Sequence, residues 1–140
     1  MGQGTGEIGQ GASEEKTKAV IKDSLDQVLF YRESIALWDL FWDDSEIMMK
    51  DLRGREMVKQ LTRSVYSISA NIEEGYGRGF GKEYPQFLRY ARGSARETKG
   101  GYEKAKRLLP ANVVEDRIER LQKIIGAITK TLKTLSEKQK

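Results

Sequence analysis

The segment from Ser67 to Glu97 contains two helical patterns joined by a glycine-rich turn, and it constrains the fold more than any other part of the chain. The first pattern places apolar and small residues three and four positions apart, as on one face of an α-helix. Glycine then occupies every second position from 75 to 81, and glycine readily adopts the left-handed backbone that ends a helix. The second pattern opens near Pro85, which a first helical turn tolerates. The segment therefore predicts a helical hairpin.

Similar patterns on both sides extend this hairpin to four helices. We predict helices over residues 22–49, 55–76 and 82–109, a break near Asp51–Gly54, and a fourth helix after Pro110. Asn112 is the expected N-cap of the fourth helix, with Glu115 three residues on as in a capping box. Short connections between four helices predict an all-α, antiparallel up-down four-helix bundle over residues 19–140. Residues 1–18 are glycine-rich and polar, so we expect a flexible tail there.

The composition excludes several classes of function. The chain contains neither cysteine nor histidine, which rules out disulfides, thiolate zinc sites and every nucleophile pair that uses histidine. No segment is apolar enough for a signal peptide or a membrane span, so we expect a cytoplasmic protein. No feature calls for a cofactor or a metal. The formal net charge is +4, but residues 51–140 carry 20 basic and 11 acidic residues, so the positive charge lies in the last three helices.

The third predicted helix carries a stripe of cations that could bind a polyanion. Arg92, Lys99 and Lys106 are seven residues apart on one flank, Arg89 and Arg96 lie beside them, and Lys82 continues the line. Basic patches attract nucleic acids through phosphate contacts and counterion release. The alternative is a solvated face with intrahelical pairs, such as Arg96 with Glu103.

The glycine-rich turn is a second, weaker candidate for contact with nucleic acid. Arg78 and Lys82 supply charge there, and Tyr76 and Phe80 could stack on unpaired bases. Glycine-rich turns between helices are common, so the turn alone does not establish a site.

The polar residues nearest to a catalytic arrangement are Asn71, Glu74 and Glu97, which flank the inner faces of the second and third helices. We expect them to satisfy backbone groups or to pair with an arginine such as Arg63 or Arg78. A catalytic role would require a buried pair of Glu74 and Glu97 lining a pocket.

The first predicted helix has more apolar surface than one inward stripe requires. Either it is the most buried helix of a monomer, or its second apolar face packs against another subunit. We favour the second interpretation, with Trp38, Phe41 and Trp42 at the interface. The acidic residues Asp39, Asp43, Asp44 and Glu46 of the same helix could instead face a different protein.

Seventeen positions in the hairpin agree in spacing with the signature of a known family. They are Ser67, Ile68, Asn71, Ile72, Glu74, Gly75, Gly77, Arg78, Lys82, Glu83, Tyr84, Phe87, Leu88, Ala91, Gly93, Ser94 and Glu97. In these residues the chain resembles the four-helix-bundle proteins encoded within intervening sequences of bacterial 23S rRNA. More distantly, it is similar to the accessory proteins of diversity-generating retroelements, which pair a pentameric bundle with a reverse transcriptase. Glu73, the long acidic first helix and the glycine-rich tail depart from the family pattern.

The resemblance implies a small cytoplasmic bundle without enzymatic activity that assembles as a homo-oligomer, usually a pentamer, with suspected binding to RNA. Our main hypothesis is a non-enzymatic, oligomeric nucleic-acid-binding protein, with RNA as its ligand. Its binding residues would be Arg78, Lys82, Arg89, Arg92, Arg96, Lys99 and Lys106. The alternative is a protein–protein scaffold, or an accessory subunit that docks on a nucleic-acid enzyme such as a reverse transcriptase.

Overall fold

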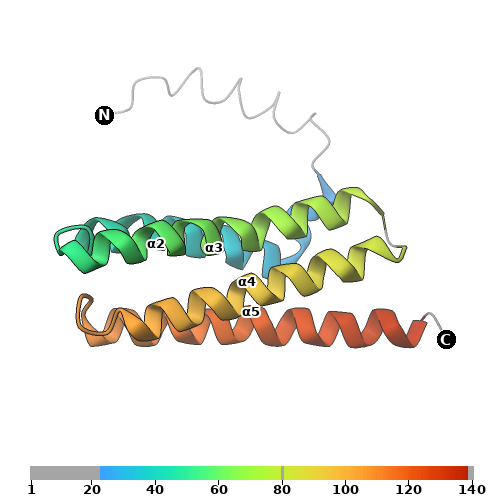
Figure 1. Cartoon of the computed structure of the whole chain (residues 1–140). Helices are drawn as coiled ribbons and strands as arrows, with labels where there is room; N and C mark the ends of the chain where they lie inside the picture. Colours follow the sequence, from blue (N-terminus) through green and yellow to red (C-terminus); the bar gives the residue numbers. More distant parts are fainter. Residues whose placement is uncertain (1–22, 80, 139–140) are drawn as a thin grey trace, which may run out of the picture.

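A computed structural model of the chain describes residues 23–79 and 81–138, and in these residues it contains four long α-helices. They are α2 (Leu29–Met48), α3 (Leu52–Gly77), α4 (Glu83–Lys104) and α5 (Ala111–Lys138), and a short 3-10 turn, η1 (Ser24–Gln27), precedes α2. Consecutive helices run antiparallel (Figure 1): α3 packs on α4, α4 packs on α5, and α2 closes the bundle against α3 and α5. The predicted four-helix bundle is confirmed, whereas the predicted flexible tail lies outside the described residues.

The core is built from stripes with helical spacing on all four helices. On α2 the buried stripe is Phe30, Ser34, Leu37, Phe41, Asp44 and Met48, spaced by three or four residues. The predicted inward stripes of α3, α4 and α5 also face the core, with Ile68, Leu88 and Ile128 fully buried. Burial of these faces supplies most of the stability of helices that would be marginal in isolation.

The first helix begins later than the predicted residue 22. The Asp23 side chain caps η1 by accepting a hydrogen bond from the Leu25 N–H at 3.0 Å. Val28 then adopts an extended backbone (φ −78°, ψ 115°), which separates η1 from α2. Because of this break, Leu25 and Phe30 both enter the core. The predicted continuous helix from residue 22 is therefore wrong at its start.

The α2–α3 connection depends on two residues within the predicted break. Asp51 is the N-cap of α3, and its carboxylate accepts hydrogen bonds from the Arg53 N–H at 2.8 Å and the Gly54 N–H at 3.4 Å. Gly54 lies in the first turn of α3 against the end of α2, where a Cβ atom would be 1.9 Å from the Met48 carbonyl oxygen. The helix therefore starts at Leu52, three residues earlier than predicted.

The α3–α4 interface is lined by small residues. The Thr98 hydroxyl donates to the Ser64 hydroxyl at 2.8 Å, and the Ser94 hydroxyl donates to that of Ser67 at 2.8 Å. A Cβ atom at Gly101 would lie 2.5 Å from Leu61 Cδ2, so glycine lets the two helices approach closely there. This close approach does not extend to Gly93 and Gly100, because a Cβ placed at either position would meet no neighbouring helix within 4 Å.

Three further helix ends also differ from the prediction. The α3 helix continues to Gly77, and among the described glycines only Gly79 has a positive φ, of 83°. The α4 helix ends at Lys104, and residues 105–109 form a turn in which Ala105 and Leu109 are buried. Asn112 is not the N-cap of α5, because the helix begins at Ala111 and the Pro110 carbonyl accepts from the N–H groups of residues 113 and 114.

Candidate nucleic-acid interface

The arginines of α4 lie on the outside of the bundle, on the flank that faces α5. The Arg92 guanidinium donates from Nη1 to Thr129 Oγ1 of α5 at 3.2 Å, and the Arg89 guanidinium donates to Gln86 Oε1 at 2.9 Å. Arg96 is exposed and makes neither a hydrogen bond nor an ion pair within the described ranges. The positive charge of these three arginines is therefore not neutralised by a carboxylate inside the described part of the protomer.

The intrahelical pair between Arg96 and Glu103, named as part of the alternative interpretation, does not form. Instead, Lys99 Nζ lies 3.5 Å from Glu103 Oε2, an i,i+4 pair on the same helix. Of the predicted stripe, Lys99 is thus the cation whose charge is locally balanced. Lys82 is exposed just before α4, and Lys106 is exposed in the turn after it, so the stripe extends beyond both ends of the helix.

Arg78, the predicted cation of the glycine-rich turn, is engaged within the protein. Its guanidinium bonds to Glu74 Oε2 at 2.9 Å and to Glu83 Oε2 at 2.8 Å, and its Cζ lies 5.6 Å from the centre of the Phe87 ring. The Glu74 bond and then the charge of Glu83 raise the pKa of Arg78 above its usual value. Arg78 therefore joins α3 to α4 rather than presenting a free charge. Phe80 lies outside the described residues.

An open groove follows the seam between α4 and α5 beside these cations. It encloses about 480 Å³ and is lined by Arg96, Lys99, Gly100 and Glu103 from α4 and by Gln122, Ile125 and Gly126 from α5. A Cβ placed at Gly100 or Gly126 would meet no neighbouring helix within 4 Å, so the absence of side chains there leaves the groove open. The predicted cationic stripe thus borders a concave surface, which the sequence did not reveal.

The carboxylates considered for catalysis are not brought together as a buried pair. Glu74 is exposed and bonds to Arg78, whereas Glu97 is exposed on α4 and lines a groove of about 270 Å³ with Gln60, Gly101 and Lys104. Asn71 donates from its side-chain amide to the Ser67 carbonyl at 2.8 Å and to the Ser67 hydroxyl at 2.8 Å. In the described part of the chain, no group of three acidic residues is arranged to hold a metal ion.

Aromatic side chains cover the outer surface between α2 and α3. Trp38 contacts Trp42 and Tyr66 edge-on, with ring centres 6.2 and 5.7 Å apart, and Trp42 is 60% exposed. Ile35, 38% exposed, extends this surface along α2. Phe41, also predicted for a subunit interface, is 2% exposed and belongs to the protomer core. Its inclusion in a surface site was therefore wrong. We call Ile35, Trp38, Trp42 and Tyr66 the aromatic face.

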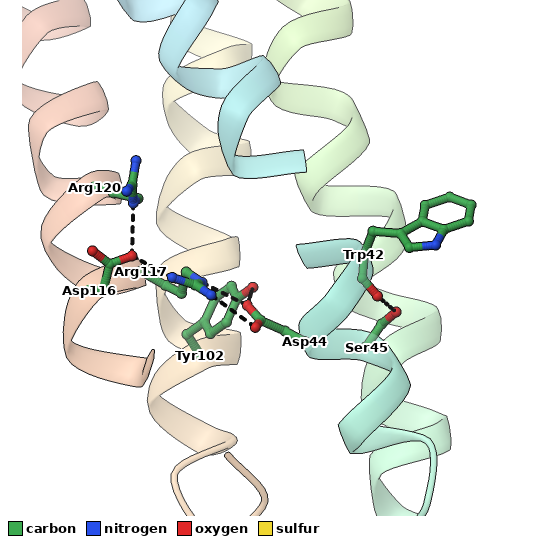
Figure 2. Close-up of polar contacts among 7 residues, drawn as sticks. All are labelled: Trp42, Asp44, Ser45, Tyr102, Asp116, Arg117 and Arg120. Atoms are coloured by element: carbon green, nitrogen blue, oxygen red, sulfur yellow. Dashed lines mark hydrogen bonds and ion pairs between the residues drawn. The ribbon is translucent and has the colours of Figure 1, made fainter. Parts of the chain in front are cut away.

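A buried polar network that the sequence did not predict joins α2, α4 and α5 (Figure 2). Arg117 binds both carboxylate oxygens of Asp44, with Nε–Oδ2 at 2.8 Å and Nη2–Oδ1 at 3.1 Å. The Tyr102 hydroxyl donates to Asp44 Oδ2 at 2.6 Å. Arg117 also contacts Asp116, which pairs with Arg120 at 2.8 Å. The prediction that Asp44 could face a different protein is wrong, because its side chain is 3% exposed.

The network shifts the ionisation of its members. Burial, and then the hydrogen bond to Asp44, raise the pKa of Tyr102 far above its usual value. The bond to Asp44 raises the pKa of Arg117, and the bond to Arg120 lowers the pKa of Asp116. Each shift favours the protonation state that the hydrogen bonds require, so Arg117 stays charged and Tyr102 neutral at physiological pH.

One signal in the sequence could have revealed this network. Asp44 continues the three-and-four spacing of the buried α2 stripe, between Phe41 and Met48, so its position on the helix is a core position. Figure 2 shows the consequence: Asp44 points toward α4 and α5, whereas Trp42, two residues earlier, extends in the opposite direction, on the side of α3.

None of the helices in the described ranges combines the length and apolar character needed to cross a membrane. No curated protein matches the chain at a significant level. Residues 27–134 match the sequence model of a family described as the 23S rRNA-intervening sequence protein. This match covers all of α3 and α4, all of α2 and most of α5, and it agrees with the motif in the α3–α4 hairpin. The chain therefore belongs to the 23S rRNA-intervening sequence protein family.

Proposed function

We propose that this protein is a non-enzymatic, cytoplasmic homo-oligomer that binds RNA through the basic outer surface of α4. The observation that carries the proposal is the unneutralised charge of Arg89, Arg92 and Arg96. All three are held by the rigid α4 helix, and none pairs with a carboxylate in the described part of the chain. Arginine binds phosphate through parallel N–H donors, so unpaired guanidinium groups along one helix suit a phosphodiester backbone.

The aromatic face supports the oligomeric part of the proposal. Exposed tryptophan and tyrosine side chains that contact one another on a surface are enriched at protein–protein interfaces. Trp38, Trp42 and Tyr66 lie between α2 and α3, whereas the cationic side chains of α4 lie toward α5. Subunits that pack through the aromatic face would leave the basic surface open. Resemblance to the family suggests a pentamer.

A direct binding measurement tests the proposal. The affinity of the full-length protein for a fluorescently labelled RNA hairpin is measured by anisotropy between about 50 and about 200 mM salt. We expect the logarithm of the affinity to fall linearly with the logarithm of the salt concentration, because each phosphate contact releases counterions. Binding that ignores salt, or no binding at low salt, would contradict the proposal.

A second candidate function is a scaffold or accessory subunit for a nucleic-acid enzyme. It is favoured by the acidic residues Asp39, Asp43 and Glu46, which are exposed on α2 next to Trp42 and form no ion pair within residues 23–79 and 81–138. A basic protein surface could bind there. Affinity purification with wild-type protein and with an Asp39→Asn, Asp43→Asn double variant tests this candidate. Recovery of only further copies of the same chain would reject it.

A further inference from the structure

We infer that the α4–α5 groove, and not the most outward surface of α4, holds the phosphodiester backbone of bound RNA. The inference rests on the proposed function and adds the location of the ligand. A ligand in the groove would also contact α5, because Gln122, Ile125 and Gly126 of that helix line it.

The cations that border the groove are placed to grip a chain of phosphates. Arg92 reaches across the seam to Thr129, so its guanidinium is held between the two helices while its remaining N–H donors stay available. Arg96 follows one helical turn later, about 6 Å along the axis, and lines the groove without a partner in the described ranges. Lys99 follows about 4.5 Å further on and is oriented by Glu103. The cations thus form a row parallel to the groove.

Close packing of helices does not require the two glycines of the groove. Glycine inside a helix lowers helix stability more than any residue except proline. At Gly101 a larger residue would clash with Leu61, which explains the glycine there. Gly100 and Gly126 have no such contact, yet both line the groove. Glycine allows a ligand to approach the backbone closely. A sugar–phosphate chain entering between α4 and α5 accounts for the open glycines and the cations together.

The groove also has the chemistry to contact more than phosphate. The Gln122 side chain offers an amide donor and acceptor for sugar hydroxyls, and the half-buried Ile125 gives an apolar surface. Glu103, the acidic residue that lines the groove, is paired with Lys99, so the charge of Lys99 offsets its repulsion of a polyanion. The local balance at the groove remains positive because Arg96 adds to this neutral pair, and Arg92 lies one helical turn before Arg96 on the same seam.

Variants that fill the groove without changing its charge test whether the RNA binds in the groove or only to the basic surface in general. Gly100→Leu and Gly126→Leu place a side chain in the groove, and Gly93→Leu is the matched control. Gly93 is on the same helix as Gly100 and equally open, but it does not line the groove. All three variants are expected to raise the urea denaturation midpoint, because leucine replaces glycine inside a helix. Only the two groove variants are expected to weaken binding of the RNA hairpin, by about tenfold, a change of about 1.4 kcal/mol.

The outcomes distinguish the location of the ligand from the function itself. Weaker binding in Gly93→Leu together with wild-type affinity in Gly126→Leu would place the RNA on the outward surface of α4 and overturn the inference. Wild-type affinity in both groove variants, together with weaker binding when Arg89, Arg92 and Arg96 are replaced, would also overturn it and leave the proposed function intact. A lower mass by light scattering in the groove variants would identify the groove as a subunit interface instead. If the wild-type protein fails to bind, both proposals fall.

Discussion

Arg117 of α5 donates hydrogen bonds to both carboxylate oxygens of Asp44 of α2, and these bonds connect the last helix of the bundle to the first. The Tyr102 hydroxyl completes the site from α4, so three helices meet at one carboxylate. The pair is largely buried, with 12% of the Arg117 side chain exposed. A buried ion pair of this kind adds little compared with well-packed apolar residues, but removal of one partner leaves an uncompensated charge.

The first prediction concerns this pair. Asp44→Ala should destabilise the protein by about 3–5 kcal/mol, because Arg117 and the Tyr102 hydroxyl would no longer have their shared acceptor. The measurement is the free energy of unfolding from urea denaturation. Asp43→Ala is the control, because Asp43 is exposed and should change stability by no more than about 0.5 kcal/mol. Equal destabilisation in the two variants would contradict the role assigned to the network.

The second prediction contrasts two glycines within helices. Gly54→Ala should destabilise the protein, because the new Cβ atom would overlap the Met48 carbonyl, 1.9 Å away, and force apart the α2–α3 connection. Gly93→Ala meets no neighbour within 4 Å and should stabilise α4 by up to about 1 kcal/mol. Thermal unfolding of both variants shows whether the melting temperature falls in Gly54→Ala and rises in Gly93→Ala. A neutral Gly54→Ala variant would show that the tight connection is not required.

The fold and the candidate site differ in how much of each the sequence could predict. Spacings of three and four residues identified the inward stripes of α3, α4 and α5, because burial of an apolar face dominates helix packing. The break at Val28 escaped prediction because it depends on how Leu25 and Phe30 fit the core. Asn112 has the chemistry of a cap, but the helix already begins at Ala111, after the Pro110 carbonyl.

The site was predicted by residue type but not by shape. The sequence placed Arg89, Arg92 and Arg96 on one side of a helix, because that depends on the helical period alone. The hydrogen bond between Arg92 and Thr129, and the open space beside Gly126, depend on how α4 and α5 are aligned with each other. Asp44 was misassigned because a charged residue is normally exposed unless it is paired, and its partner Arg117 is 73 residues away.

The third prediction concerns the pH dependence of Tyr31. Burial, followed by its hydrogen bond to Glu73 at 2.8 Å, raises the pKa of Tyr31 to about 12. The raised pKa means that the folded state holds the phenolic proton more tightly than the unfolded state. Its contribution to stability is present below about pH 10, the usual tyrosine pKa, and disappears as the pH rises through about 12.

Two variants check this assignment. Glu73→Gln should lower the pKa of Tyr31 toward its usual value, because it removes the neighbouring negative charge. The phenolate absorbance, followed as the pH rises, reports the shift, and Tyr31→Phe identifies which part of the signal belongs to Tyr31. A titration curve that Glu73→Gln leaves unchanged would mean that the hydrogen bond does not influence this residue.

The fourth prediction tests the aromatic face. Trp42→Ala should lower the mass of the protein in solution while leaving its helix content unchanged, because Trp42 is 60% exposed and lies outside the protomer core. Light scattering and circular dichroism give the two readouts. Tyr90→Ala is the matched control, since Tyr90 is an exposed aromatic residue of α4. A mass that falls only in the Tyr90 variant would place the subunit interface on α4 and contradict the prediction.

The unneutralised arginines of α4 are the central feature of this account, and the salt dependence of RNA binding tests them most directly. The Arg89→Gln, Arg92→Gln, Arg96→Gln triple variant is compared with wild type and with a Lys59→Gln, Arg63→Gln, Lys123→Gln control, which removes the same charge from exposed positions on α3 and α5. We predict that the α4 variant binds the RNA hairpin more weakly, with a salt slope smaller by about 0.9 for each phosphate that it no longer neutralises, whereas the control keeps nearly the wild-type slope. Equal slopes in the two variants would contradict a binding surface on α4.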